Sequence, residues 1–66
     1  MTPKYKNIQV RLVGEDGNAF AIMSRVTSAL RKGGVSEDEV QQYIAESMSG
    51  DYDALLRTAQ MWVAVS

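Results

Sequence analysis

The chain has 66 residues, no cysteine and no histidine, and a formal net charge of −1. This length allows one domain, residues 1–66, whose core supplies only about 3–5 kcal/mol of stability. The composition excludes a disulfide framework and a structural zinc site. Packing must therefore hold the fold together, and a homodimer would bury further apolar surface.

The segment from Met1 to Gln9 is polar and basic. It lacks the roughly 7–15 apolar residues of a signal peptide, and no stretch approaches the ~20 apolar residues of a membrane span. We expect a cytoplasmic protein with no membrane partner and no cofactor, in which residues 1–5 are poorly ordered.

The segment from Lys6 to Leu12 alternates between polar and apolar residues, which is typical of a half-buried strand. The apolar face holds Ile8, Val10 and Leu12, and the outward face holds Tyr5, Asn7, Gln9 and Arg11. Gly14, Asp16 and Gly17 then have the chemistry of a turn and end the strand.

A first helix is predicted from about Ala19 to Lys32, with Asn18 as its N-cap. Gly33 and Gly34 supply its left-handed end. Its apolar stripe consists of Ala19, Ile22, Met23, Val26, Ala29, Leu30 and Gly33.

A second helix of about twelve residues has the clearest start signal. Ser36 and Glu39 form a capping box, Val35 and Val40 occupy the staple positions, and Gly50 closes the helix as its C-cap. The predicted stripe contains Val40, Tyr43, Ile44, Ser47 and Met48.

A third helix begins after Asp51, its N-cap, and carries an apolar face of Tyr52, Leu55, Leu56 and Ala59. Beyond Gln60 the pattern suits a helix or a strand, and we favour a short strand within residues 62–65 because the first strand needs a partner. The sequence thus predicts an α+β fold of order β-α-α-α-β, with three helices on one face of an antiparallel two-stranded sheet. Pairing between two copies of the chain is the competing solution.

If the helices alternate in direction, the starts of the first and third helices lie at the same end. Glu15, Asp16, Asp51 and Asp53 would then be neighbours, and such carboxylates could hold calcium or magnesium. The alternative, which we favour, is that each acid caps or complements its own helix, because the spacing does not match an EF-hand loop.

Charge is distributed unevenly along the chain. Up to Gly33 there are six basic residues and two acidic ones, and from Gly34 onward one basic residue and six acidic ones. The basic half could bind nucleic acid, and the residues that would do so are Tyr5, Arg11, Arg25, Arg31 and Lys32. We favour a solvated face instead, because useful affinity requires several phosphate contacts.

No catalytic or cofactor-binding residue is predicted. With no histidine or cysteine, the serines have no evident activating base, and the glycines do not form a phosphate loop. Met23, Met48 and Met61 are interpreted as core residues rather than an adaptable binding surface. Trp62 either completes the core or anchors an interface.

Three segments carry a resemblance: residues 13–20 (VGEDGNAF), 29–31 (ALR) and 49–57 (SGDYDALLR). The chain resembles, from about Gln9 to Arg57, a group of small bacterial and phage-borne proteins with no settled activity. The resemblance implies at most a small accessory protein, and a mobile element is the source that it suggests. We therefore predict a non-enzymatic interaction module that binds an unidentified macromolecule or itself. Nucleic-acid binding and divalent-cation binding are the alternatives.

Overall fold

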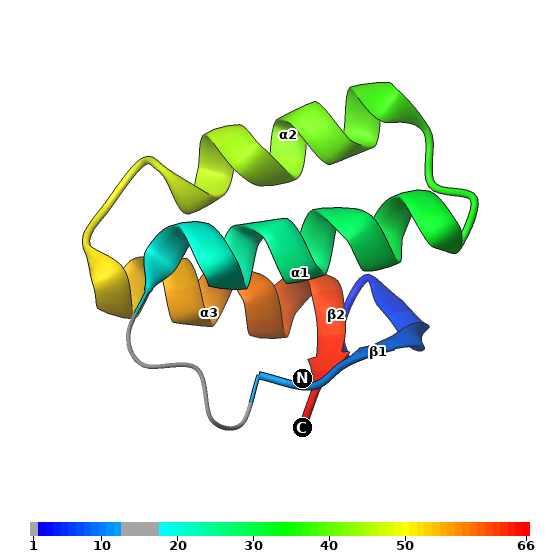
Figure 1. Ribbon diagram of the computed structural model, residues 1–66, viewed down its shortest axis with the longest axis horizontal. Coiled ribbons are helices and arrows are strands. Elements are labelled where there is room, and N and C mark those ends of the chain that lie inside the picture. Colours follow the sequence, from blue (N-terminus) through cyan, green and yellow to red (C-terminus); the bar gives the residue numbers. More distant parts are fainter. Residues whose placement is uncertain (1, 13–17) are drawn as a thin grey trace.

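The computed structural model describes residues 2–12 and 18–66. A strand, three helices and a second strand follow one another along the chain (Figure 1). These elements are β1 (Tyr5–Val10), α1 (Ala19–Lys32), α2 (Glu37–Ser47), α3 (Tyr52–Trp62) and β2 (Val63–Val65). The α+β class and the element order are confirmed, and α1 has the predicted bounds.

Each helix begins with a side chain that accepts hydrogen bonds from the first turn. Asn18 accepts from two backbone N–H groups of α1 at 3.1 and 3.2 Å, Ser36 from one of α2 at 3.4 Å, and Asp51 from one of α3 at 2.9 Å. These bonds satisfy donors that have no partner within the helix. All three predicted N-caps are confirmed.

The two strands pair in parallel, so the predicted antiparallel arrangement is wrong. The prediction assumed that the chain keeps its direction after α3, because no glycine or proline follows Gln60. Instead, the backbone changes from helical to extended at a single residue, Val63, with φ −136° and ψ 164°. A β-branched side chain favours this extended conformation, so the chain is redirected without a turn residue.

The pairing of β1 with β2 is irregular. Tyr5 lies opposite Val63 and Gln9 opposite Ala64, so β1 advances four residues while β2 advances one. Such a bulge breaks the alternation of side chains between the two faces. Tyr5 is consequently half-buried, and its predicted place on the outward face is wrong, whereas the other three predicted members of that face are exposed.

The core lies between the sheet and the helices. α1 packs against β1, α3 packs against β2, and α2 packs against both other helices, on the side away from the strands (Figure 1). The central cluster takes buried side chains from all five elements: Val10, Val26, Leu30, Val40, Tyr43, Ala59, Trp62 and Val63. Ile8 and Leu12 pack against it, as the alternation predicted.

The helices end by different means. Gly34, just after α1, has a φ of 86°, which fits the predicted left-handed termination. Gly33 instead allows a close approach, since a Cβ there would lie 2.7 Å from Cδ1 of Ile8. The predicted C-cap at Gly50 is wrong, because α2 ends earlier, with Met48 as its C-cap.

The three helices alternate in direction. As a result, the start of α1, the end of α2 and the start of α3 lie at one end of the molecule (Figure 1). This arrangement, which the sequence analysis took as the condition for neighbouring acidic helix starts, positions the candidate site.

Candidate functional site

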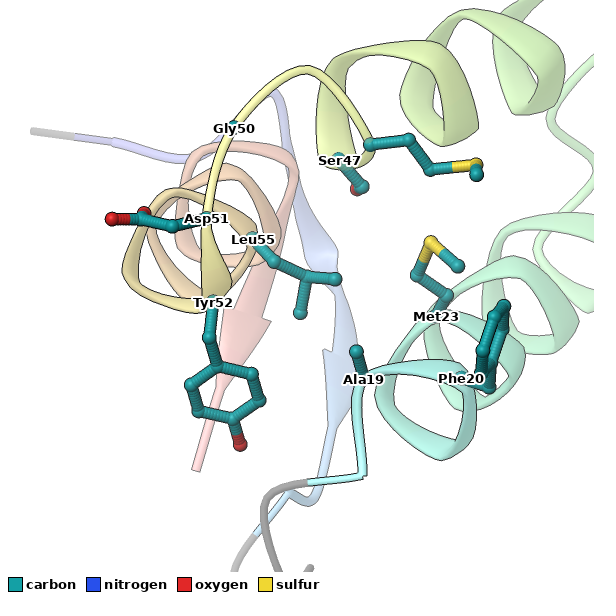
Figure 2. A pocket seen from close by; sticks show the side chains of 9 residues that line it. Ala19, Phe20, Met23, Ser47, Gly50, Asp51, Tyr52 and Leu55 are labelled. Carbon is teal, nitrogen blue, oxygen red and sulfur yellow. The ribbon is translucent and has the colours of Figure 1, made fainter.

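A pocket of about 260 Å³ opens where the three helix ends meet, and we call it the end pocket. α1 contributes Phe20 and Met23 to its lining, with Ala19 at the first position of the helix. The end of α2 contributes Ser47 and Met48, and the start of α3 contributes Asp51, Tyr52 and Leu55. In Figure 2, side chains from all three helices surround one space, with Leu55 and Met23 pointing toward each other across it.

The rim of the end pocket is apolar and exposed to solvent. Phe20 is 74% exposed, Met48 63% and Tyr52 38%. These are three of the four large apolar side chains that are exposed within residues 2–12 and 18–66; the fourth, Met61, is 57% exposed and lines a different hollow. Clustering of this kind marks binding surfaces more often than scattered exposure does.

The core interpretation of the methionines is therefore wrong for Met48 and Met61. Met48 follows the last helical residue of α2, so it lies beyond the part of the helix that packs on its neighbours. Met61 lies on α3 beside the buried Trp62, on a face turned to solvent. Met23 is half-buried and joins the pocket lining.

Two hydroxyl groups lie buried one helical turn apart on α2. Tyr43 is 0% exposed and Ser47 1%, and neither hydroxyl has a hydrogen-bond partner among the described residues. Burial raises the pKa of Tyr43, and the neighbouring Ser47 hydroxyl offsets part of that effect without reaching good hydrogen-bond geometry. Ser47 is also one of the residues that line the end pocket, although its hydroxyl oxygen is buried.

The four predicted cation ligands differ in their position and in their hydrogen bonds. Asp51 accepts a hydrogen bond from the backbone N–H of Ala54 at 2.9 Å, which is the capping role. Asp53 is exposed in the first turn of α3. Glu15 and Asp16 lie outside the described residues. Within the described part of the chain, no group of three or more acidic side chains is placed to hold a metal ion.

A second polar arrangement surrounds Glu39, near the start of α2. Its carboxylate accepts a hydrogen bond from the Tyr5 hydroxyl at 2.5 Å and pairs with Lys4 Nζ at 2.7 Å. Lys4 and Tyr5 together hold the pKa of Glu39 below its usual value. Because the carboxylate is engaged by the N-terminal segment, only the Ser36 half of the predicted capping box forms.

Three aromatic rings meet beside this ion pair, and we call Tyr5, Tyr43 and Trp62 the aromatic cluster. The Trp62 ring lies 5.9 Å from the Tyr5 ring and 5.7 Å from the Tyr43 ring. Its Nε1 donates to the Glu46 carboxylate at 2.9 Å, and Lys4 Nζ lies 4.4 Å from its ring centre. Trp62 is 3% exposed, so it completes the core of this chain.

Two of the residues predicted for nucleic acid are engaged by acidic side chains of α2. Tyr5 is held by Glu39, and Arg31 makes two hydrogen bonds to Glu37 at 2.9 and 3.1 Å, which lower the pKa of Glu37. Arg11 and Arg25 do come together: Arg25 donates to the Arg11 carbonyl at 3.4 Å, and both line a polar hollow between β1 and α1. Lys32 is exposed in the last turn of α1.

No protein-family model, curated protein or solved structure matches this chain. In the described ranges, no helix is both long and apolar enough to cross a membrane.

Sequence reasoning missed Phe20 and Ser47 as parts of a site. Phe20 lies off the apolar stripe of α1, and a large aromatic residue on the polar face of a helix is a signal that could have found it. For Ser47 there is no such signal, because it falls on the buried stripe of α2 and only the tertiary structure shows that its hydroxyl lacks a partner.

Proposed function

We propose that this protein is a non-enzymatic interaction module that binds another protein chain through the end pocket. The observation that carries the proposal is the clustering of Phe20, Met48 and Tyr52, all exposed, around one apolar hollow. Burying such side chains against a partner is favourable, at about 25 cal/mol for each Å² of apolar surface.

These side chains lie outside the core that stabilises the fold. The central core cluster contains none of them, and it is filled from every element of the fold. Because this domain is small, large apolar residues are valuable in its core. Three of them on one exposed rim are better explained by binding than by folding.

The dimensions of the end pocket favour a side chain of a partner over a small metabolite. Its volume of about 260 Å³ lies below the ~300–1,000 Å³ of ordinary ligand pockets. The chemistry of its lining does not suit catalysis, because the Ser47 hydroxyl has no hydrogen bond to a base within the described residues and so lacks activation as a nucleophile.

Selection from a random peptide library displayed on phage tests this proposal. Peptides selected on the wild-type protein should compete for one site and lose at least about tenfold in affinity on Phe20→Ser, since interface anchors account for most of the binding energy. Met61→Ser is the matched control: it also removes an exposed apolar side chain, 57% exposed, but outside the end pocket. Selected peptides that bind equally well to Phe20→Ser would contradict the proposal.

Nucleic-acid binding is the second candidate, and one observation favours it. Arg11 and Arg25 line a hollow with Gln9, Ser24 and Ser28, which are side chains suited to phosphate oxygens. Salt-sensitive retention on a nucleic-acid column that disappears in Arg11→Glu would support this function. No retention at low salt would dismiss it.

A further inference from the structure

We infer that the end pocket receives the apolar face of a basic amphipathic helix from another protein. This inference rests on the proposed function and names the partner class for the same site. Three properties of the end pocket lead to it: the bonding state of its backbone, the charge around it and the exposed aromatic side chains in its lining.

The backbone around the end pocket favours a helical partner over an extended one. Asn18 and Asp51 already occupy N–H groups at the starts of α1 and α3. At the end of α2, the carbonyls of Ile44 and Glu46 accept from Met48 and Ser49. An extended peptide would therefore leave its own backbone groups unpaired against these helix ends, whereas a helix satisfies its backbone internally and presents only side chains.

The lining is also suited to a helix face. Met23 and Met48 contribute flexible, polarisable side chains from two different helices, and thioethers adapt to the shape of an apolar anchor. Phe20 and Tyr52 stand at the mouth, where they would contact residues one turn away from that anchor (Figure 2).

Charge at the end pocket selects a basic partner. Among the described residues, Asp51 is the one charged member of its lining, and its side chain points away from the apolar space in Figure 2 and thus lies at its edge. Asp53 is exposed nearby, in the first turn of α3. Arg25 and Arg57 line other hollows. Lysine or arginine beside the partner's apolar face would complement these carboxylates.

The same charges disfavour a second copy of this chain as the occupant. A symmetric contact through the end pocket would bring Asp51 and Asp53 of both copies to one interface, and like charges at an interface are repulsive.

The aromatic side chains in the lining favour an aromatic anchor. Phe20 and Tyr52 are exposed, and aromatic rings such as the indole of tryptophan pack favourably against them, edge to face or offset-stacked. The Ser47 hydroxyl is buried too deeply for such an anchor to reach it.

Two synthetic helical peptides of about 15 residues test the inference, a length at which helices become stable in water. Both carry one tryptophan anchor and leucines on the same face; the remaining positions are lysine-rich in one peptide and glutamate-rich in the other. Fluorescence anisotropy of the labelled peptides measures binding to the wild-type protein, to the double variant Asp51→Asn with Asp53→Asn, and to Phe20→Ser. Asparagine caps a helix about as well as aspartate, so the double variant removes charge and keeps the cap.

We expect the basic peptide to bind at least about tenfold more tightly than the acidic one at low salt, with the difference shrinking as salt screens the charges. The double variant should abolish this preference, and Phe20→Ser should weaken both peptides. Equal binding of the two peptides, or tighter binding of the acidic one, would overturn the inference and leave the proposed function standing. If neither peptide binds and the phage selection also yields nothing sensitive to Phe20→Ser, both fail. A dimeric mass that becomes monomeric in Phe20→Ser would overturn the inference in favour of a second copy.

Discussion

The end pocket and the aromatic cluster both bring large side chains together from distant parts of the chain, yet they differ in how far those side chains are exposed. Each region also holds one buried hydroxyl without a hydrogen-bond partner among the described residues, that of Tyr43 in the aromatic cluster and that of Ser47 in the end pocket. In the aromatic cluster, Tyr5 donates to Glu39 and Trp62 to Glu46, and Trp62 is 3% exposed. In the end pocket, Phe20 is 74% exposed. This difference is the basis for our proposal that the aromatic cluster serves stability and the end pocket serves binding.

The largest expected effect is at the aromatic cluster. Trp62→Ala should cost about 3–5 kcal/mol, as truncation of a buried tryptophan does, which is comparable with the whole stability of a domain of this size. We therefore expect this variant to lack a cooperative thermal transition in circular dichroism. Trp62→Phe keeps most of the burial and should retain a transition at lower temperature. A cooperatively folded Trp62→Ala variant with wild-type stability would contradict the stabilising role of the aromatic cluster.

A smaller effect is expected at Asp51, which borders the end pocket but also caps α3. Asp51→Ala should lower the free energy of unfolding by about 1 kcal/mol, because an N-terminal N–H loses its acceptor. Asp51→Asn should stay within a few tenths of a kcal/mol of wild type. Urea denaturation measures both. Equal losses in the two variants would show that charge, not capping, is the stabilising property of this residue.

The Glu39 ion pair predicts a modest dependence of stability on pH. Lys4 and Tyr5 lower the pKa of Glu39 in the folded state, so this contribution is fully present above the unfolded pKa of about 4.3 and is lost as pH falls through the lower folded value. Glu39→Gln should therefore lose less stability than wild type between neutral pH and pH 3. Urea midpoints across this range measure the effect, which is modest because the pair is partly exposed. If the urea midpoints of wild type and Glu39→Gln changed with pH in parallel, the contribution of the Glu39 ion pair would be refuted.

The smallest effects on stability are expected at the two buried hydroxyls. Unlike the substitutions above, removing either hydroxyl should not destabilise the protein. Tyr43→Phe and Ser47→Ala each remove a buried polar group that has no partner in the described chain, and replacing such a group by an apolar one of similar shape is nearly neutral or slightly stabilising. Both variants should be as stable as wild type or slightly more stable in thermal unfolding. A clear loss of stability in either variant would mean that the removed hydroxyl makes a hydrogen bond in solution.

The helix starts were predictable because their signals are local. Asn18, Ser36 and Asp51 accept hydrogen bonds from residues two or three positions away, so the short-range pattern contains the information. The direction of β2 was not predictable in the same way, because it follows from a change of backbone conformation at Val63 that no turn residue marks.

The candidate site depends on contacts between distant residues. Phe20, Ser47 and Tyr52 come together only because three helices alternate in direction and end at the same place. The sequence analysis considered alternating helices as one arrangement, and for that arrangement it suggested an acidic end and not an apolar pocket. The exposure of Met48 also escaped prediction, because the apolar pattern continues one residue past the last helical residue of α2.

Phe20→Ser tests most directly whether the end pocket serves binding rather than stability. Its free energy of unfolding and its affinity for peptides selected on the wild-type protein should be measured together. We predict that the free energy of unfolding stays within about 0.5 kcal/mol of wild type, as for most surface substitutions, while peptide affinity falls at least about tenfold. A loss of more than about 1.5 kcal/mol in stability with unchanged peptide affinity would contradict this account.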